Sequence, residues 1–227
     1  MNKYVEFEVF GPYALFSDPI MRVGGEKMSY MIPTYEVVKN ICNSIYWKPT
    51  FIWKVDSLRV LNKIQTESKG IKTLKYNQAG NDLSYYTYLK NVRYQVRAHI
   101  CWNFNREEFE ADRNYGKHMS IISRSLEGGG RRDIFLGTRE CQGYVKPCKF
   151  GSGKGVYDEL SELSFGLAYH GMSYPDEAIK NEDKNKLSVR FWRPVMRNGV
   201  IDFLPPEQCK LVKYLRNMNA KIFENKK

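Results

Sequence analysis

Apolar and polar residues alternate along three stretches in the first half of the chain, at residues 4–10, 51–61 and 92–102. Successive side chains of a strand point to opposite faces, so this period of two predicts three strands that are buried on one side. The third stretch is the clearest, because apolar side chains occupy every second position while Arg93 and Arg97 lie between them. We therefore expect an antiparallel strand with one basic, exposed face.

Two other stretches have the spacing of a helix face. The first begins after Thr34, a suitable N-cap, and has apolar side chains at positions 37, 38, 41 and 45. The second covers about 114–127 and ends at three consecutive glycines, which favour helix termination. Apolar residues from Ile134 onward predict a fourth strand, whereas residues 62–84 have the composition of a long polar loop.

The predicted order of elements is strand, helix, strand, strand, helix, strand. This is the order of the α+β ferredoxin-like arrangement (βαββαβ, RRM-like), in which an antiparallel sheet carries both helices on one face. We assign it to a domain of residues 1–149. Residues 150–227 contain short alternating runs and an Asn-Gly pair at 198–199, which is a strong hairpin signal. They predict a smaller, mainly antiparallel β domain that ends in a basic amphipathic helix over residues 210–223.

The composition narrows the class of partner. The 227 residues include 36 Lys and Arg against 25 Asp and Glu, for a net charge of +11, and aromatic residues make up 14%. This charge favours nucleic acid or an anionic surface, and the aromatic content excludes a disordered basic tail. No apolar stretch approaches the ~20 residues that span a bilayer. Five cysteines without a C-x-x-C pair favour reduced thiols in a cytoplasmic protein over a disulfide or zinc framework.

The excess positive charge lies in two segments. Residues 59–97 hold eight Lys and Arg against two acids, and residues 111–154 hold nine against four. This concentration predicts a binding track for a polyanion, although a solvated basic surface remains the alternative. The candidate contacts for nucleic acid are Arg93, Arg97, Arg131 and Arg132.

The predicted topology brings two chemically important segments together. In a ferredoxin-like fold, the chain after the first helix and the start of the second helix reach the same edge of the sheet. Tyr46-Trp47-Lys48 should therefore meet Tyr115-Gly116-Lys117-His118. The chain has only three histidines, and this one lies beside a lysine at a helix N-terminus, a position that favours phosphate.

These residue types suit RNA scission without a metal. A histidine can act as general base or acid, and a lysine ammonium can stabilise the phosphorane. A tyrosine can position or polarise the attacking 2′-hydroxyl. No acidic cluster resembling a metal site accompanies them, so we expect neither a metal nor a cofactor. The alternative is a core tyrosine and an ordinary histidine at the helix cap, and the residues alone favour neither reading.

Three further features have less specific interpretations. The segment Gly151-Ser152-Gly153-Lys154-Gly155 lacks the spacing of a phosphate loop and predicts a flexible interdomain turn. His99 lies on the polar face of the third strand and suits either contact with RNA or, the favoured interpretation, a satisfied surface histidine. His170 is interpreted as structural. The tyrosines at 85, 86 and 88 suit either base stacking or strand formation.

Four segments carry a resemblance to a known family. They are VEFEVFGP at 5–12, the region from SY at 29–30 to YWKP at 46–49, NYGKH at 114–118 and RSLEGGGRR at 124–132. Together they resemble the CRISPR-associated Cas-five family, specifically the subtype I-C (Dvulg-type) branch of the RAMP superfamily, over essentially the whole chain.

The resemblance implies an endoribonuclease that cuts precursor CRISPR RNA at the base of the repeat hairpin and remains with the 5′ handle in the interference complex. The implied catalytic residues are Tyr46, Lys117 and His118. The implied RNA-approach segment is Gly128, Gly129 and Gly130, followed by the two arginines. The implied partners are CRISPR repeat RNA, other subunits of a type I-C complex and, non-specifically, DNA, with no membrane and no cofactor. The alternatives are a non-catalytic subunit that caps the 5′ handle and a generic RNA-binding module.

Overall fold

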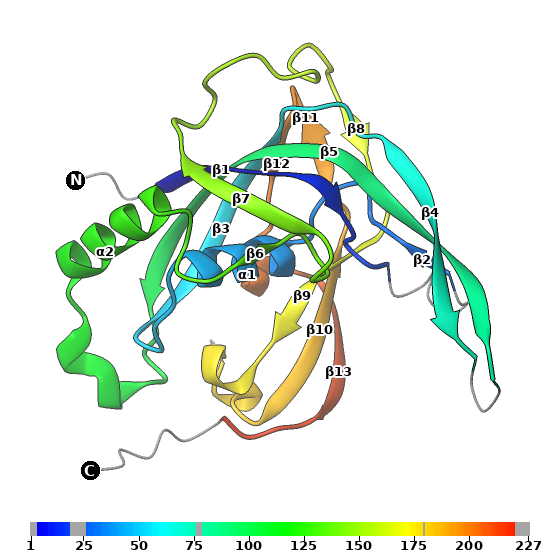
Figure 1. Cartoon of the computed structure of the whole chain (residues 1–227). Coiled ribbons are helices and arrows are strands. Elements are labelled where there is room, and N and C mark those ends of the chain that lie inside the picture. The colour runs from blue at the N-terminus through cyan, green and yellow to red at the C-terminus, as the bar shows by residue number, and fades with distance from the viewer. Residues whose placement is uncertain (1–3, 19–25, 76–78, 179, 221–227) are drawn as a thin grey trace.

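Within the described residues, 4–18, 26–75, 79–178 and 180–220, a computed structural model shows a ten-stranded sheet and a separate three-stranded sheet (Figure 1). The large sheet consists of β1 (Val5–Ala14), β2 (Lys27–Met28), β3 (Phe51–Val60), β4 (Thr66–Leu74), β5 (Asn81–Trp102), β6 (Ile134–Phe135), β7 (Gln142–Pro147), β8 (Leu163–Ser164), β11 (Val195–Arg197) and β12 (Val200–Asp202). The small sheet consists of β9 (Ala168–Ser173), β10 (Lys186–Trp192) and β13 (Leu211–Asn217). The helices are α1 (Tyr35–Ile45), α2 (Tyr115–Glu127) and the 3-10 helices η2 (Glu107–Asp112), η3 (Pro175–Glu177), η4 (Asn181–Asp183) and η5 (Pro206–Gln208).

The central strands lie in the order β7-β1-β5-β3, and each neighbouring pair is antiparallel. In the sequence, α1 lies between β1 and β3, and α2 lies between β5 and β7. These elements have the order of the predicted βαββαβ arrangement, and the predicted α+β class is confirmed. None of the helices in the described residues combines the length and apolarity needed to cross a membrane.

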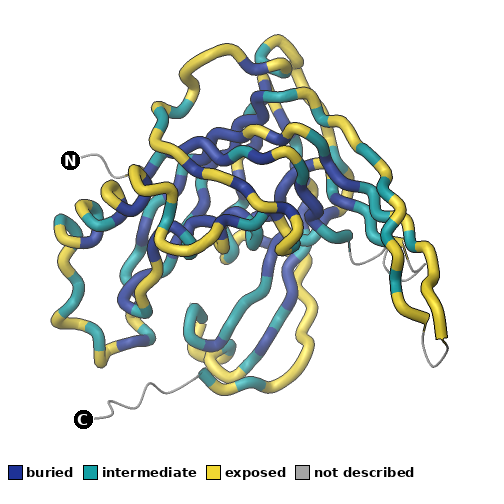
Figure 2. Tube along the Cα trace, viewed as in Figure 1, coloured by how far each residue is buried: buried dark blue, intermediate teal, exposed yellow. Residues whose placement is uncertain are grey.

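Both predicted helices form at the expected places, because each is capped by a residue only three positions from its hydrogen-bond partner. The Thr34 hydroxyl accepts a hydrogen bond from the backbone N–H of Val37 (3.3 Å), which caps α1. The Asn114 side chain accepts from the backbone N–H of Lys117 (3.0 Å), which caps α2. The apolar face of α1 is buried in one core with the helix-facing side of the sheet, as the dark central segments in Figure 2 show.

The prediction of a long polar loop over residues 62–84 is wrong. This region contains β4 and the first part of β5, which pair from Thr66 opposite Leu89 to Leu74 opposite Asn81. The hairpin extends away from the body of the molecule, and its far part is mostly exposed (Figures 1 and 2). Because both faces of this ribbon contact solvent, burial does not impose the alternation by which a strand is recognised.

The prediction of a helix over residues 210–223 is also wrong where the structure describes it. Leu211–Asn217 is β13, the edge strand of the small sheet, and residues 221–223 lie outside the described part. Every residue of β13 is exposed, so neither face has to be apolar. The predicted fourth strand at Ile134 is only two residues long, and β7 is the strand that pairs with β1.

Residues after 150 contribute to both sheets. The hairpin of β11 and β12 turns at Asn198 and Gly199, with φ of +48° and +76°, and confirms the Asn-Gly signal. Because β12 pairs with β3, this hairpin continues the large sheet. The division into domains at residues 149 and 150 stays a prediction.

The glycine-rich segment 151–155 packs on the sheet rather than forming a free turn. The carbonyl of Ser152 accepts hydrogen bonds from Arg59 (3.0 Å) and Gln95 (2.8 Å), and the Gly151 N–H donates to Gln95 (2.9 Å). Asp158, just beyond the segment, forms an ion pair with Arg59 at 2.7 Å. Arg59 and Gln95 are both buried, so this segment covers part of the sheet face opposite the helices.

Candidate active site

Tyr46 is the first residue beyond α1, where the backbone becomes extended (φ −162°, ψ 128°). Its N–H still donates to the carbonyl of Cys42 (3.0 Å), and its carbonyl accepts from the indole N–H of Trp53 (2.9 Å). These bonds fix the turn that directs the tyrosine ring into the core, where the residue is 1% exposed. Burial raises the pKa of the Tyr46 hydroxyl, because the phenolate would be poorly solvated there.

His118 lies in the first turns of α2 and is fully buried. Its Nδ1 atom lies 3.1 Å from the Tyr46 hydroxyl oxygen. The rings of Phe51 and Trp102 enclose the imidazole, with centroid separations of 5.3 Å and 5.8 Å. The predicted meeting of the segment after α1 with the start of α2 is therefore confirmed for these two residues.

The other ring nitrogen assigns the tautomer of His118. Nε2 lies 2.8 Å from the backbone carbonyl oxygen of Asp112. A carbonyl oxygen only accepts hydrogen bonds, so we assign a proton to Nε2. In the neutral imidazole Nδ1 is then the acceptor, and the Tyr46 hydroxyl donates to it. Nδ1 therefore has the Tyr46 hydroxyl as its hydrogen-bond partner inside the aromatic enclosure.

Lys117 is the exposed member of the predicted catalytic set, with 51% of its side chain in solvent. Its ammonium forms an ion pair with the carboxylate of Asp112. This hydrogen-bonded pair raises the pKa of Lys117 and lowers the pKa of Asp112, so both groups are charged near neutral pH. The site therefore presents one cation to solvent directly beside the buried tyrosine–histidine pair.

The glycine turn after α2 has a conformational role. Gly129 and Gly130 have φ of +82° and +104°, which side chains with a Cβ rarely adopt. The Gly130 N–H donates to the carbonyl of Ser125 (2.7 Å) and closes α2, while the Arg131 N–H donates to the carbonyl of Ser44 (3.1 Å) near the end of α1. These amides therefore tie the two helix ends together. Contact between the glycine turn and RNA stays a prediction.

The turn places one of its two arginines at the site. The Arg131 guanidinium lies over the Tyr46 ring, 4.8 Å from its centroid, and Nε donates to the Ser125 hydroxyl (3.2 Å). Arg132 follows with an exposed side chain, and its N–H donates to the carbonyl of Ser44 (3.0 Å). Arg131 thus covers the tyrosine ring with an exposed, cationic group.

The other two predicted arginines lie elsewhere. On β5 they alternate with the core residues, so Arg93 and Arg97 face away from the helices. Each forms an ion pair with a carboxylate of β1: Arg93 with Glu8 (2.7 Å) and Arg97 with Glu6 (2.9 Å). The two carboxylates of β1 therefore neutralise part of the excess positive charge of residues 59–97. The structure does not bring them together with Tyr46, and their contact with RNA stays a prediction.

Asp112 is the residue of the site that the sequence does not indicate. Its carboxylate accepts from the Thr50 hydroxyl (2.8 Å) as well as from Lys117, and its carbonyl binds His118. Asp112 ends η2, a short helix in a loop that has no periodic pattern. The nearest signal is its position two residues before the Asn114 cap, which is too common to identify a site.

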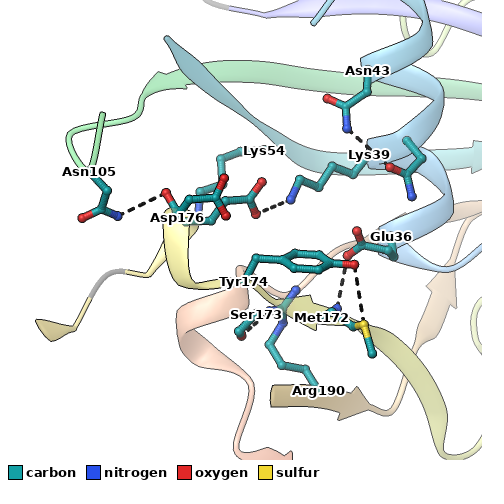
Figure 3. Close-up of polar contacts among 12 residues, drawn as sticks. Glu36, Lys39, Asn43, Lys54, Asn105, Met172, Ser173, Tyr174, Asp176 and Arg190 are labelled. Atoms are coloured by element: carbon teal, nitrogen blue, oxygen red, sulfur yellow. Dashed lines mark hydrogen bonds and ion pairs between the residues drawn. The ribbon is translucent and has the colours of Figure 1, made fainter. Parts of the chain in front are cut away.

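A second polar cluster joins α1 to the small sheet (Figure 3). Lys39 of α1 forms an ion pair with Glu177, and the Glu36 carboxylate accepts from the backbone N–H of Met172 (3.2 Å). The buried Arg190 of β10 donates to the Ser173 hydroxyl. Since these charged side chains have partners within the protein, we interpret the cluster as the attachment of the small sheet to α1.

Within the part of the chain that the structure describes, no three His, Cys, Asp or Glu side chains are grouped so that they could hold a metal ion. The expectation of chemistry without a metal or cofactor stays a prediction. Of the histidines outside the site, His99 has a partner as interpreted, an ion pair with Asp56 (2.7 Å), but it is half-buried rather than on the surface. The buried His170 bonds to the carbonyl of Leu204 (2.8 Å), as expected of a structural residue.

The fold and the site define a class: a mainly antiparallel α+β protein with a buried tyrosine–histidine pair and cations beside it. A family model described as CRISPR-associated protein (Cas_Cas5) matches residues 4–204. The chain therefore belongs to the Cas5 family of CRISPR-associated proteins, and the model that matches is that of the Cas5d branch.

Two curated relatives are similar over nearly their full length. One, from Mannheimia succiniciproducens, is 26% identical over 94% of this chain and 100% of its own, and the other, from Thermus thermophilus, is 28% identical over 96% and 98%. Both are named "CRISPR pre-crRNA endoribonuclease Cas5d". A solved structure titled "Crystal Structure of CRISPR-associated Protein" matches with a TM-score of 0.78 and 33% identity, covering 93% of this chain and 97% of that one. A functionally uncharacterized protein from Streptococcus mutans matches with a TM-score of 0.73, also at 33% identity and the same coverage.

Proposed function

We propose that this chain is a metal-independent endoribonuclease that cuts precursor CRISPR RNA at the repeat hairpin. The names of the two curated relatives support an RNA-processing activity, and they align with nearly the whole chain. The observation that carries the proposal is the 3.1 Å contact between the Tyr46 hydroxyl and Nδ1 of His118, with the Lys117 ammonium at the same helix terminus.

The proposed reaction is attack of a 2′-hydroxyl on the adjacent phosphorus. The 2′-oxygen gives its proton to the Tyr46 oxygen while the tyrosine proton passes to Nδ1 of His118, so the base is the tyrosine–histidine pair. Lys117 stabilises the phosphorane charge and gives a proton to the departing 5′-oxygen. The products are a 2′,3′-cyclic phosphate and a 5′-hydroxyl, and Lys117 and His118 then return to their initial protonation states through solvent.

RNA has to reach a tyrosine that is 1% exposed. Arg131 covers the Tyr46 ring from the solvent side and carries a charge that phosphate attracts. In the proposed complex, Arg131 leaves the ring for an RNA phosphate, and this movement exposes the tyrosine hydroxyl. Substrate binding and assembly of the catalytic groups are then coupled.

We propose that the product stays bound by its 5′ handle within a type I-C interference complex, together with that complex's other subunits. Family membership supports this, as does the net charge of +11. The proposal places the protein in the cytoplasm. We also expect non-specific binding of DNA, because a basic surface attracts any polyanion.

A second candidate function is supported by burial. Tyr46 and His118 are 1% and 0% exposed, as expected of core residues in a subunit that binds the 5′ handle without cutting it. This candidate requires the same RNA affinity but no chemistry at the tyrosine–histidine pair.

One experiment separates the two functions. The protein is incubated in EDTA with the repeat RNA of its own CRISPR array, beside His118→Ala, Lys117→Ala and the control His99→Ala. We expect cleavage by the wild type and the control, a cyclic phosphate end on the upstream fragment, and strong loss in the other two variants. An uncut hairpin with wild-type protein would leave only the binding function. Equal cleavage by His118→Ala would disprove the site assignment.

A further inference from the structure

Asp112 is at the centre of the hydrogen bonds around the candidate site. Its carboxylate oxygens engage the Lys117 ammonium and the Thr50 hydroxyl, the latter at 2.8 Å. The second oxygen also lies 3.5 Å from Nε2 of His118. Its backbone carbonyl accepts from that same Nε2 and from the N–H of Asn114, each at 2.8 Å. One residue thus contacts both the exposed cation and the buried imidazole.

The loop around Asp112 holds it in place. The next residue, Arg113, donates from one guanidinium nitrogen to the carbonyls of Asn103 (3.3 Å) and Arg106 (3.2 Å). Thr50, directly before β3, is fully buried, so its hydroxyl is a fixed donor. The carboxylate is therefore anchored independently of Lys117, and it stays beside His118 when the lysine moves.

The charge balance of the site changes when Lys117 moves. In the free protein the ammonium neutralises the carboxylate, which is why the pKa of Asp112 is lowered and that of Lys117 is raised. A phosphate of bound RNA competes for this half-exposed ammonium. Once Lys117 bonds to phosphate, the carboxylate charge beside His118 is less compensated, and a nearby negative charge favours imidazolium.

We propose that Asp112 is a positioning residue whose ion pair with Lys117 is exchanged for RNA phosphate, after which its carboxylate stabilises the His118 imidazolium. The inference rests on the proposed function. The proton transfers are those of the proposed reaction: the 2′-hydroxyl proton goes to Tyr46, and the Tyr46 proton goes to Nδ1. The exchange leaves the Asp112 carboxylate facing the imidazolium without its lysine partner, so RNA binding itself completes the site.

The test compares Asp112→Asn with Glu107→Gln. Glu107 is in the same short helix and exposed, and the substitution removes the same charge without touching Arg113. Single-turnover cleavage of the repeat RNA is measured in EDTA at saturating protein across a pH series, and RNA affinity is measured separately. For Asp112→Asn we expect a rate at saturation that is lower by at least about tenfold and RNA affinity that is unchanged or tighter. A lower rate at saturation without a loss of affinity separates loss of the charge beside His118 from loss of RNA binding.

Thr50→Val provides a second variant should Asp112→Asn fail to fold. It removes the donor that anchors the carboxylate and leaves every charge in place, so we expect the same changes to a smaller extent. Glu107→Gln should match the wild type. The proposal is overturned if Asp112→Asn, or Thr50→Val in its place, cleaves at the wild-type rate, or loses RNA affinity with no change in the rate at saturation. If wild-type protein does not cut, both the proposed function and this inference fail; wild-type cleavage with an equally active Asp112→Asn removes only the inference.

Discussion

The Tyr46 hydroxyl and Nδ1 of His118 lie 3.1 Å apart, although 72 residues separate them in the chain. Each residue lies at a helix terminus: Tyr46 directly follows α1, and His118 lies in the first turns of α2. Local capping sets each of these positions, and the sheet order brings them together. The contact is therefore a direct product of the topology.

Replacing Tyr46 with Phe tests the proton path. The ring and its packing remain, but Nδ1 of His118 loses its donor inside the core, which costs about 1–3 kcal/mol of unfolding free energy. We expect single-turnover cleavage to fall by roughly 10²- to 10⁴-fold, since the group that contacts the 2′-hydroxyl is gone. Urea unfolding and cleavage assays measure the two effects. A stable variant with near wild-type cleavage would show that His118 reaches RNA without Tyr46.

Gly130→Ala tests the conformational role of the glycine turn. Gly130 has φ of +104°, and an added Cβ would lie 3.2 Å from the carbonyl of Arg132. We expect a loss of about 1–3 kcal/mol in unfolding free energy, together with weaker cleavage as Arg131 shifts from Tyr46. Gly128→Ala is the matched control, because its φ is −80° and its Cβ would make only ordinary contacts. Equal unfolding free energies for the two variants would refute this role.

Replacing Arg131 and Arg132 tests whether the glycine turn belongs to the predicted binding track for a polyanion. Each phosphate contact to single-stranded RNA contributes about 0.7 to the slope of log affinity against log salt. Arg131→Ala with Arg132→Ala should therefore flatten the slope by roughly 1.4. The control is Arg197→Ala. Arg197 is an exposed arginine of β11 that forms an ion pair with Glu162, and its replacement should leave the slope unchanged. If the double variant retains the wild-type slope, the turn is not part of the RNA interface.

The ion pair between His99 and Asp56 should make the stability of the protein depend on pH. Its hydrogen bond to the Asp56 carboxylate (2.7 Å) raises the pKa of His99 to about 9, above its ordinary value near 6.5. The folded state therefore binds the proton more tightly than the unfolded state. This contribution is fully present below pH ~6.5 and is lost as the pH rises through about 9.

The measurement is the free energy of unfolding in urea at pH 6, 7.5 and 9 for wild type and His99→Gln. The difference between the two proteins should shrink as the pH rises. A difference that is constant over this range would mean that the ion pair with Asp56 does not contribute through its charge.

Local signals account for the helices and for one hairpin. Thr34 and Asn114 cap helices whose apolar spacing is regular, and Asn198-Gly199 supplies the positive φ angles of a tight turn. Each of these features depends on a few neighbouring residues, so the sequence is sufficient to predict them. The β4–β5 hairpin and β13 were not predicted, for two reasons. Their strands pair through backbone groups, which every residue has. Because both faces of these strands contact solvent, their sequences show no alternation of apolar and polar residues.

By itself, the sequence determined the α+β class, the resemblance to a CRISPR-associated family and, through topology, the proximity of Tyr46 to His118. Only the tertiary structure decided what surrounds each charge. Arg93 and Arg97 look free along the chain, but β1 places Glu8 and Glu6 beside them. Asp112 looks like an ordinary loop residue until folding sets its carbonyl and carboxylate against His118 and Lys117. Charge and hydrogen bonding act over a few ångströms in space, so the function of such groups depends on neighbours that are distant in the sequence.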